Sequence, residues 1–210
     1  MPRKTVSQQP RRHSRQTADA RRRSLIDAAI RCLSRGGIAG FTIDRISLEA
    51  GVSRGLINHH FNGIGGLMAA VYGAMTASMR SAGQAALAVE GGGEPKLSAV
   101  IDIMFAPPVF SKSSLRAWLA LWGEVAVNPS LKAAHRASYA GYHEAMARAI
   151  GEIAGLRAAP VDGGELATIC IALIDGLWIE WCLESGVVSR QSARDAVYGV
   201  LEARLGPLQR

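Results

Sequence analysis

Residues 42–61, TIDRISLEAGVSRGLINHHF, constrain the fold of this chain more than any other segment. Apolar residues recur at helical spacing on each side of Gly51, which predicts two short helices. Gly51 adopts positive φ without steric cost, so it supplies a sharp turn between them. Thr42 and Ser53 stand where each helix needs an N-cap. The segment therefore predicts a helix-turn-helix, a geometry in which the second helix enters a DNA major groove.

The charge of the chain is concentrated in its first part. Residues 1–60 hold 12 Lys or Arg and 4 Asp or Glu, a net charge of +8. Residues 61–210 hold 12 Lys or Arg and 13 Asp or Glu, a net charge of −1. This asymmetry favours a nucleic-acid-binding module joined to a neutral domain, and the alternative is a solvated basic tail.

The second short helix carries polar side chains suited to groove contact. Ile46, Val52 and Ile57 are expected to face inward, and Phe61 to anchor the helix end. Arg54 can pair with guanine or phosphate, Asn58 can contact adenine, and a leucine can pack on a thymine methyl. The residues predicted to contact DNA are Thr42, Arg45, Ser53, Arg54, Gly55, Leu56, Asn58, His59 and His60. Gly55 weakens the helix, so we expect close backbone approach there, either to DNA or to the first helix.

Helical periodicity runs through the rest of the chain, and no stretch alternates with period two. The sequence predicts an all-α protein of about nine helices. We expect a disordered basic arm over 1–17, a helix-turn-helix domain over 18–66 and an effector-binding and dimerisation domain over 67–210. The helices beyond residue 61 are expected at 67–87, 95–105, 113–127, 129–154, 165–185 and 189–205.

Composition excludes several classes of protein. Apolar residues make up 49% of the chain, enough for a sizeable core. Three scattered cysteines indicate neither a disulfide framework nor a zinc site, and we expect a cytoplasmic protein without metal or cofactor. The apolar run 166–183 contains Asp175 and Glu180, so it is interpreted as a buried helix rather than a membrane span. The catalytic motifs of common enzyme classes are missing, so an enzyme is a remote alternative.

Residues 25–67 resemble the DNA-binding domain of the TetR family of bacterial repressors. Gly-Val-Ser-Arg-Gly at 51–55 and Phe61 stand where that family has them, whereas Ser47 replaces a usual alanine. The family usually has a lysine that touches phosphate at the position of Ile64. The resemblance implies a TetR-like fold, a palindromic double-stranded DNA operator, a homodimer and a small-molecule effector.

Three further segments are similar to the choline-responsive, BetI-type branch of this family: LINHHF at 56–61, LRAWLALW at 115–122 and ALIDGLW at 172–178. This likeness implies a repressor of glycine-betaine synthesis whose effector is choline or a related quaternary ammonium compound. Two alternatives stay open: a TetR-type repressor that senses another ligand, and a sequence-independent DNA-binding protein.

Aromatic and acidic residues gather in the second half of the chain. Aromatic faces and a carboxylate are what a quaternary ammonium group needs, because it cannot donate hydrogen bonds. The predicted ligand-binding residues are Trp118, Trp122, Tyr139, Asp175 and Trp178. Core packing is the alternative for each tryptophan, and an ion pair with a buried arginine is the alternative for Asp175.

The helix at 165–185 is apolar nearly all round and must be buried on more than one side. We expect it to pair with the helix at 189–205 and with their copies in a second subunit, as a four-helix interface. The helix at 67–87 is expected to be the only helical connection that transmits effector binding to the helix-turn-helix.

Overall fold

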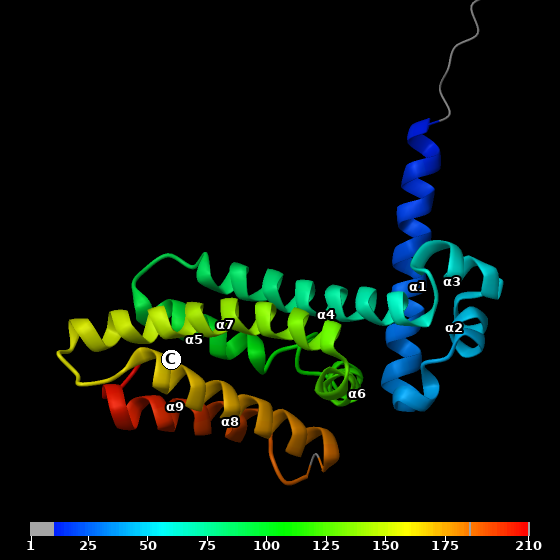
Figure 1. The fold of residues 1–210 in the computed structure, drawn as a ribbon. Helices are drawn as coiled ribbons and strands as arrows, with labels where there is room; N and C mark the ends of the chain where they lie inside the picture. The colour runs from blue at the N-terminus through cyan, green and yellow to red at the C-terminus, as the bar shows by residue number, and fades with distance from the viewer. Residues whose placement is uncertain (1–10, 185, 210) are drawn as a thin grey trace, which may run out of the picture.

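The computed structural model describes residues 11–184 and 186–209, and these residues form nine helices and no strand. The all-α expectation is confirmed. The helices are α1 (Arg11–Gly40), α2 (Ile43–Ala50), α3 (Arg54–Phe61), α4 (Ile64–Leu87), α5 (Gly93–Met104), α6 (Lys112–Val127), α7 (Pro129–Leu156), α8 (Gly163–Leu183) and α9 (Arg190–Leu205). Figure 1 shows α1–α3, the N-terminal head, at one end of an elongated body built from α5–α9.

Helix α1 begins inside the arm predicted over 1–17. It begins at Arg11, so the disordered arm predicted over 11–17 is wrong for the described part of that segment, and residues 1–10 lie outside the described residues. The backbone leaves helical geometry at Gly37 (φ 55°, ψ −152°) and turns helically again up to Gly40. The basic N-terminal segment thus extends the helix by almost two turns.

Side-chain caps explain where several helices begin. Asn128 Oδ1 accepts hydrogen bonds from the backbone nitrogens of Ser130 and Leu131 at 3.0 and 3.2 Å. Asp162 caps α8 in the same way, and Ser189 forms a capping box with Ser192 at the start of α9. Each cap satisfies backbone N–H groups that have no partner inside the helix.

The head and the body meet along two helices. Helix α4 leaves the head, packs against α1 and α3, and continues along α5 and α7 (Figure 1). Helix α6 also packs extensively against α1. The expectation that α4 is the only helical connection is therefore wrong: a direct α1–α6 contact is a second route between head and body.

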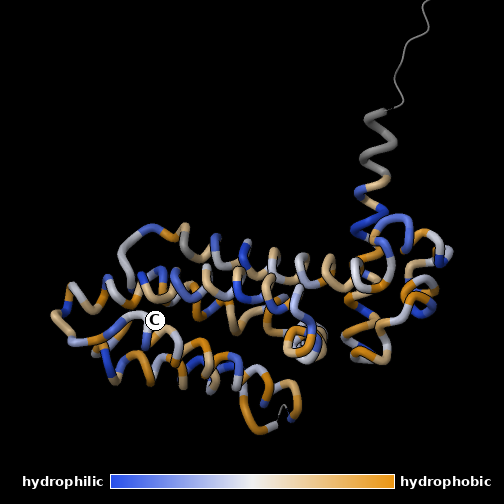
Figure 2. Tube along the Cα trace, in the orientation of Figure 1, coloured by the Kyte–Doolittle hydropathy of each residue, from blue (hydrophilic) through white to orange (hydrophobic). Residues whose placement is uncertain are grey.

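Helix α8 forms the centre of the body. It packs against α6, α7 and α9, and it buries Cys170, Ile174 and Trp178. Figure 2 shows its strongly apolar sequence, and among the described helices it alone is both long and apolar enough to cross a bilayer. In this structure its apolar residues serve the core of the body.

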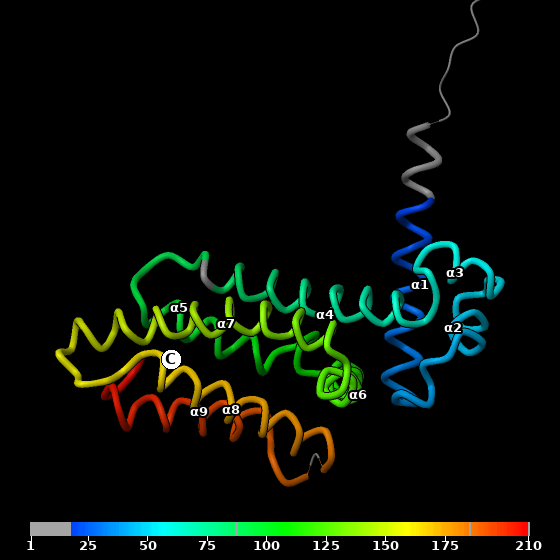
Figure 3. The backbone as a smooth tube through the Cα atoms, in the orientation of Figure 1, coloured from blue at the N-terminus to red at the C-terminus, as the bar shows by residue number. Residues whose placement is uncertain are grey.

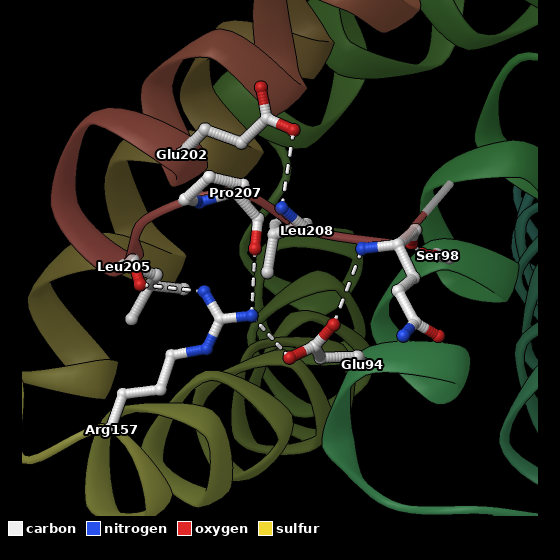
Figure 4. A network of polar contacts seen from close by, with 8 residues as sticks. Glu94, Ser98, Arg157, Glu202, Leu205, Pro207 and Leu208 are labelled. Atoms are coloured by element: carbon white, nitrogen blue, oxygen red, sulfur yellow. Dashed lines mark hydrogen bonds and ion pairs between the residues drawn. The ribbon is translucent and has the colours of Figure 1, made fainter.

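The C-terminal segment folds back over the body, at the end away from the head (Figure 3). Arg157 donates to the carbonyl oxygens of Leu205 and Pro207, both at 2.7 Å, and forms an ion pair with Glu94 (Figure 4). Ser98 Oγ donates to the carbonyl of Gln209 at 2.8 Å. This network ties α5, α7 and the end of α9 together.

Candidate nucleic-acid interface and effector pocket

A small apolar core holds α3 against the head. Ile46 and Ile57 are fully buried, and Phe61 closes the end of α3 with the Arg22 guanidinium 4.9 Å from its ring centroid. Gly51 lies in the left-handed region (φ 66°) and turns the chain between α2 and α3. One side of α3 is thereby fixed inward and the opposite side faces solvent, as the sequence predicted.

Seven of the nine residues predicted to contact DNA are exposed on the head, and the other two are half-buried. Leu56 and His60 are half-buried, and Leu56 packs partly against the core. The exposed members are Thr42, Arg45, Ser53, Arg54, Gly55, Asn58 and His59. Leu56 therefore has less free surface for a thymine methyl than expected.

The two N-cap residues differ in what they do. Thr42 Oγ1 accepts a hydrogen bond from Arg45 N at 3.3 Å, which is the expected cap of α2. Ser53 occupies the N-cap position of α3, but its side chain accepts no cap hydrogen bond, so the expectation of a side-chain cap there is wrong. Its hydroxyl and the first N–H groups of α3 are available to an anion such as phosphate.

The arginines of the head take different positions. Arg54 Nε lies 2.7 Å from Asp44 Oδ1 in an exposed ion pair that joins α3 to α2. Arg45 is directed toward the end of α1, where a β-carbon on Gly36 would lie 3.4 Å from its guanidinium. Arg54 thus lies on the exposed face of α3, whereas the Arg45 side chain lies beside the end of α1.

Gly55 has no close neighbour in the described chain. A β-carbon at this position would meet no described atom within 4 Å, and its φ is not in the left-handed region. Close packing on α1 is therefore not the reason for this glycine. Close approach of the Gly55 backbone to DNA stays a prediction.

A cavity of about 460 Å³ opens in the body between α4 and α7, with α5, α6 and α8 around it. All five predicted ligand-binding residues line it: Trp118, Trp122, Tyr139, Asp175 and Trp178. Residues from three different helices thus meet at one place, although sequence spacing alone could not show that they do.

Aromatic rings form a connected wall at one end of this cavity. Trp118 lies 6.1 Å from Trp122 and 5.9 Å from Tyr72 between ring centroids. Tyr72 Oη and His135 Nδ1 are hydrogen-bonded at 3.0 Å, and the His135 ring lies 5.7 Å from Tyr139. We call these five residues, Tyr72, Trp118, Trp122, His135 and Tyr139, the aromatic wall.

Trp178 has a mixed role. It is almost fully buried, and its Nε1 donates to the carbonyl of Met104 at 3.0 Å. Trp178 is therefore a core residue that also lines the cavity, so core packing and ligand contact do not exclude each other here.

Asp175 is the charged group on the aromatic side of the cavity. It makes no hydrogen bond or ion pair with the described residues, which excludes the arginine partner considered from the sequence for the part of the chain described. Burial raises the pKa of its carboxyl from 3.8 to about 6. Burial, with the Asp175 charge as a further cause, also raises the pKa of Tyr139 and Tyr142. An ionised Asp175 is thus poorly solvated and would gain from a cation.

Two members of the aromatic wall, Tyr72 and His135, were not predicted as site residues. Burial lowers the pKa of His135, which favours the neutral imidazole. The four-residue spacing of His135 and Tyr139 on one helix was the available signal, since such a pair shares a face. Tyr72 had no signal of its own, because the crossing of α4 over α7 is a tertiary feature.

Two protein-family models match this chain. Residues 25–71 match the model of bacterial regulatory proteins of the TetR family, and residues 93–206 match the C-terminal domain of BetI-type transcriptional repressors. The chain belongs to the TetR family. Its branch is the BetI-type one.

Relatives and solved structures agree with this TetR-family assignment. The HTH-type transcriptional regulator BetI of Escherichia coli K12 is 30% identical over 176 residues, which covers 82% of this chain and 88% of that protein. A transcriptional regulator from Pseudomonas aeruginosa PAO1 is 32% identical, with a TM-score of 0.81 over 93% of this chain and 95% of its own. A regulator from Saccharomonospora viridis, solved in complex with choline, has the same fold (TM-score 0.81, 91% of this chain and 100% of its own) at 22% identity. These relatives are regulators of transcription and not enzymes.

An apolar strip of this TetR-family regulator is left uncovered on α8. Ile169 is 41% exposed and Leu183 is 66% exposed, and Ala172 and Gly176 between them are also exposed. The adjoining helix α9 exposes the small residues Ala196, Gly199 and Ala203. This surface is the one that the sequence predicted to pair with a second subunit.

Proposed function

We propose that this regulator acts in the cytoplasm as a homodimeric repressor that leaves a palindromic operator when a quaternary ammonium effector, such as choline, enters the cavity. The observation that carries the proposal is Asp175, a half-buried carboxylate with no partner among the described residues, next to the aromatic wall. Ring faces and one carboxylate attract a cation without requiring hydrogen-bond donors from it. The choline found in the Saccharomonospora viridis regulator supports this choice of effector. The regulon we propose is glycine-betaine synthesis.

The DNA contacts we propose are the exposed side chains of α3 with the N-termini of α2 and α3. Arg54 exchanges Asp44 for a base edge or a phosphate, and Asn58 and His59 contact bases or the backbone. Thr42 and Ser53 contact phosphate, and Gly55 lets the helix approach closely. Ile64, 36% exposed, supplies no phosphate contact at the position of the family's lysine.

Effector binding can reach the head by two routes. Helix α4 carries Tyr72 and Thr76 of the cavity, and α6 carries Trp118 and Trp122 and packs on α1. A cation drawn to Asp175 repositions both helices and changes the separation of the two heads in a dimer. A shift of this kind is expected to couple the sites by about 1–3 kcal/mol.

The test begins with selection of bound sequences from a random DNA pool, to obtain the operator. Operator affinity is then measured at fixed salt with choline, with its neutral isostere 3,3-dimethylbutanol and without ligand. We expect choline to weaken operator binding about 5- to 150-fold and the isostere to have much less effect. Equal affinities in all three conditions would exclude the quaternary ammonium effector, and no preference over random DNA would favour the sequence-independent alternative.

A further inference from the structure

The cavity is longer than a choline molecule requires. Its lining runs along α4 from Tyr72 to Gln84 and along α7 from His135 to Arg148. At the rise of an α-helix these stretches span about 18–20 Å. The hydrogen bond between Tyr72 and His135 marks one end, and α4 and α7 run from it in the same direction, away from the head (Figure 1).

Asp175 belongs to the aromatic end of this cavity. His143 Nε2 lies 3.0 Å from the carbonyl oxygen of Gly164 and 2.9 Å from Thr168 Oγ1, so the start of α8 packs beside the second half of α7. Helix α8 then runs back along α7. Asp175, two turns beyond Thr168, is about 10 Å closer to the His135 end.

The opposite end of the cavity is cationic. Arg80 on α4 and Arg148 on α7 line it, both are exposed, and neither forms an ion pair or a hydrogen bond with any described residue. Gln84 adds an amide, and one exposed carboxylate, Glu144, lies a turn before Arg148. Two guanidinium groups therefore share this end with one carboxylate.

The guanidinium groups match an anion in chemistry and position. Arginine presents a planar fork of N–H donors that fits a carboxylate or a phosphate. Asp175 lies about 10 Å on the His135 side of the contact between Thr168 and His143, and Arg148 lies about 8 Å beyond His143 in the opposite direction. The backbones that carry Asp175 and Arg148 are thus about 18 Å apart along the cavity, and the ligand together with the two side chains must span that distance.

We propose that the effector is a zwitterion, in which a quaternary ammonium group binds at Asp175 and the aromatic wall and a carboxylate binds Arg80 and Arg148 across a spacer of three carbons or more. This inference rests on the quaternary ammonium effector proposed above and adds its anionic end. Choline fills only the aromatic end. Glycine betaine, with a single carbon between its charges, is too short to reach both ends.

The test is calorimetric titration of the full-length protein with four probes. These are choline, glycine betaine, γ-butyrobetaine and the carboxamide of γ-butyrobetaine, which has the same length without the negative charge. The protein variants are Arg148→Gln and Arg80→Gln. Arg136→Gln is the matched control, because Arg136 is exposed on the same helix but does not line the cavity.

We expect γ-butyrobetaine to bind about ten-fold or more tightly than its carboxamide and more tightly than glycine betaine. Arg148→Gln should abolish that advantage, Arg80→Gln should reduce it, and Arg136→Gln should leave it unchanged. All three variants should bind choline as the unmodified protein does.

Equal binding of the acid and the carboxamide would overturn the anionic subsite while choline binding still supported the proposed function. An acid preference that survives both Arg148→Gln and Arg80→Gln would also overturn it. Absence of binding by choline and by both butyrobetaine derivatives would instead overturn the quaternary ammonium effector itself, together with this inference.

Discussion

At the scale of single residues, Asp175 links stability and ligand binding through its protonation. Its carboxyl has a pKa of about 6 in the folded chain against an ordinary value of 3.8. The folded state therefore binds the proton more tightly than the unfolded state does. The ligand-free protein should lose stability as pH rises from about 4 to about 6, by up to about 3 kcal/mol.

Asp175→Asn should remove that loss, because an amide does not titrate. Chemical denaturation at pH 4.5, 5.5 and 7 measures the stability of variant and parent. Identical pH profiles would contradict the raised pKa of Asp175. Choline affinity has the opposite dependence: it should rise as pH passes through 6 and the carboxylate forms. In Asp175→Asn it should be low and independent of pH.

The aromatic wall gives a second residue-scale prediction. Trp122→Leu should weaken choline binding about 2- to 30-fold, since a cation–π contact contributes about 0.5–2 kcal/mol. Trp181→Leu is the matched control, because Trp181 is also half-buried but packs on Phe110, with 4.3 Å between ring centroids, outside the cavity. Titration calorimetry compares the two variants, and an equal loss in both would indicate a packing effect.

At the scale of helices, Gly55 lies on the exposed side of α3, where we propose that DNA binds, and a glycine there lowers helix stability. Gly55→Ala meets no described atom within 4 Å and gains helix propensity, so the free energy of unfolding should rise by up to about 1 kcal/mol. Operator affinity should nevertheless fall, because the added methyl separates α3 from DNA. Chemical denaturation of Gly55→Ala tests the expected rise in stability, and operator titration of the same variant tests the expected fall in affinity.

Gly73→Ala is the control for that variant. Gly73 is an exposed glycine of α4, and a β-carbon there also meets nothing within 4 Å. It should stabilise the protein to a similar extent and leave operator affinity unchanged. Unaltered DNA binding by Gly55→Ala would mean that the backbone at this turn does not approach DNA closely.

The ion pair between α2 and α3 gives a further helix-scale prediction. Arg54→Ala should lower operator affinity and reduce the slope of log affinity against log salt by about one if Arg54 contacts a phosphate. A base contact would instead relax sequence preference at one operator position. The Arg54 side chain is 72% exposed in its ion pair with Asp44, so Arg54→Ala should hardly change folding stability.

At the scale of the whole molecule, two heads must be held at a fixed separation to bind a palindrome. Ile169→Glu places a charge in the exposed apolar strip of α8, and it should shift the dimer toward monomer without unfolding the body. Operator affinity should fall at least ten-fold because one head is lost from each complex. Sedimentation velocity and operator titration test this, and an unchanged dimer would place the interface elsewhere.

Much of the fold was predictable from local patterns. Helical spacing, the Gly51 turn and the caps at Thr42 and Asn128 act between residues close in sequence, so element types and most bounds followed. The start of α1 did not, because a polar and basic segment without apolar period was interpreted as an arm, although the structure continues the helix through it.

Sequence alone determined that the chain is all-α and that α3 is amphipathic with a polar outer face. It also indicated that three tryptophans and Asp175 lie together in the effector-binding part of the chain. These properties depend on contacts within a few turns of helix. Only the tertiary structure decided that Tyr72 and His135 join the aromatic wall, that Arg80 and Arg148 line the same cavity, and that α6 packs on α1. Such pairings depend on how helices distant in sequence cross, and that is set by the packing of the whole core rather than by any local pattern.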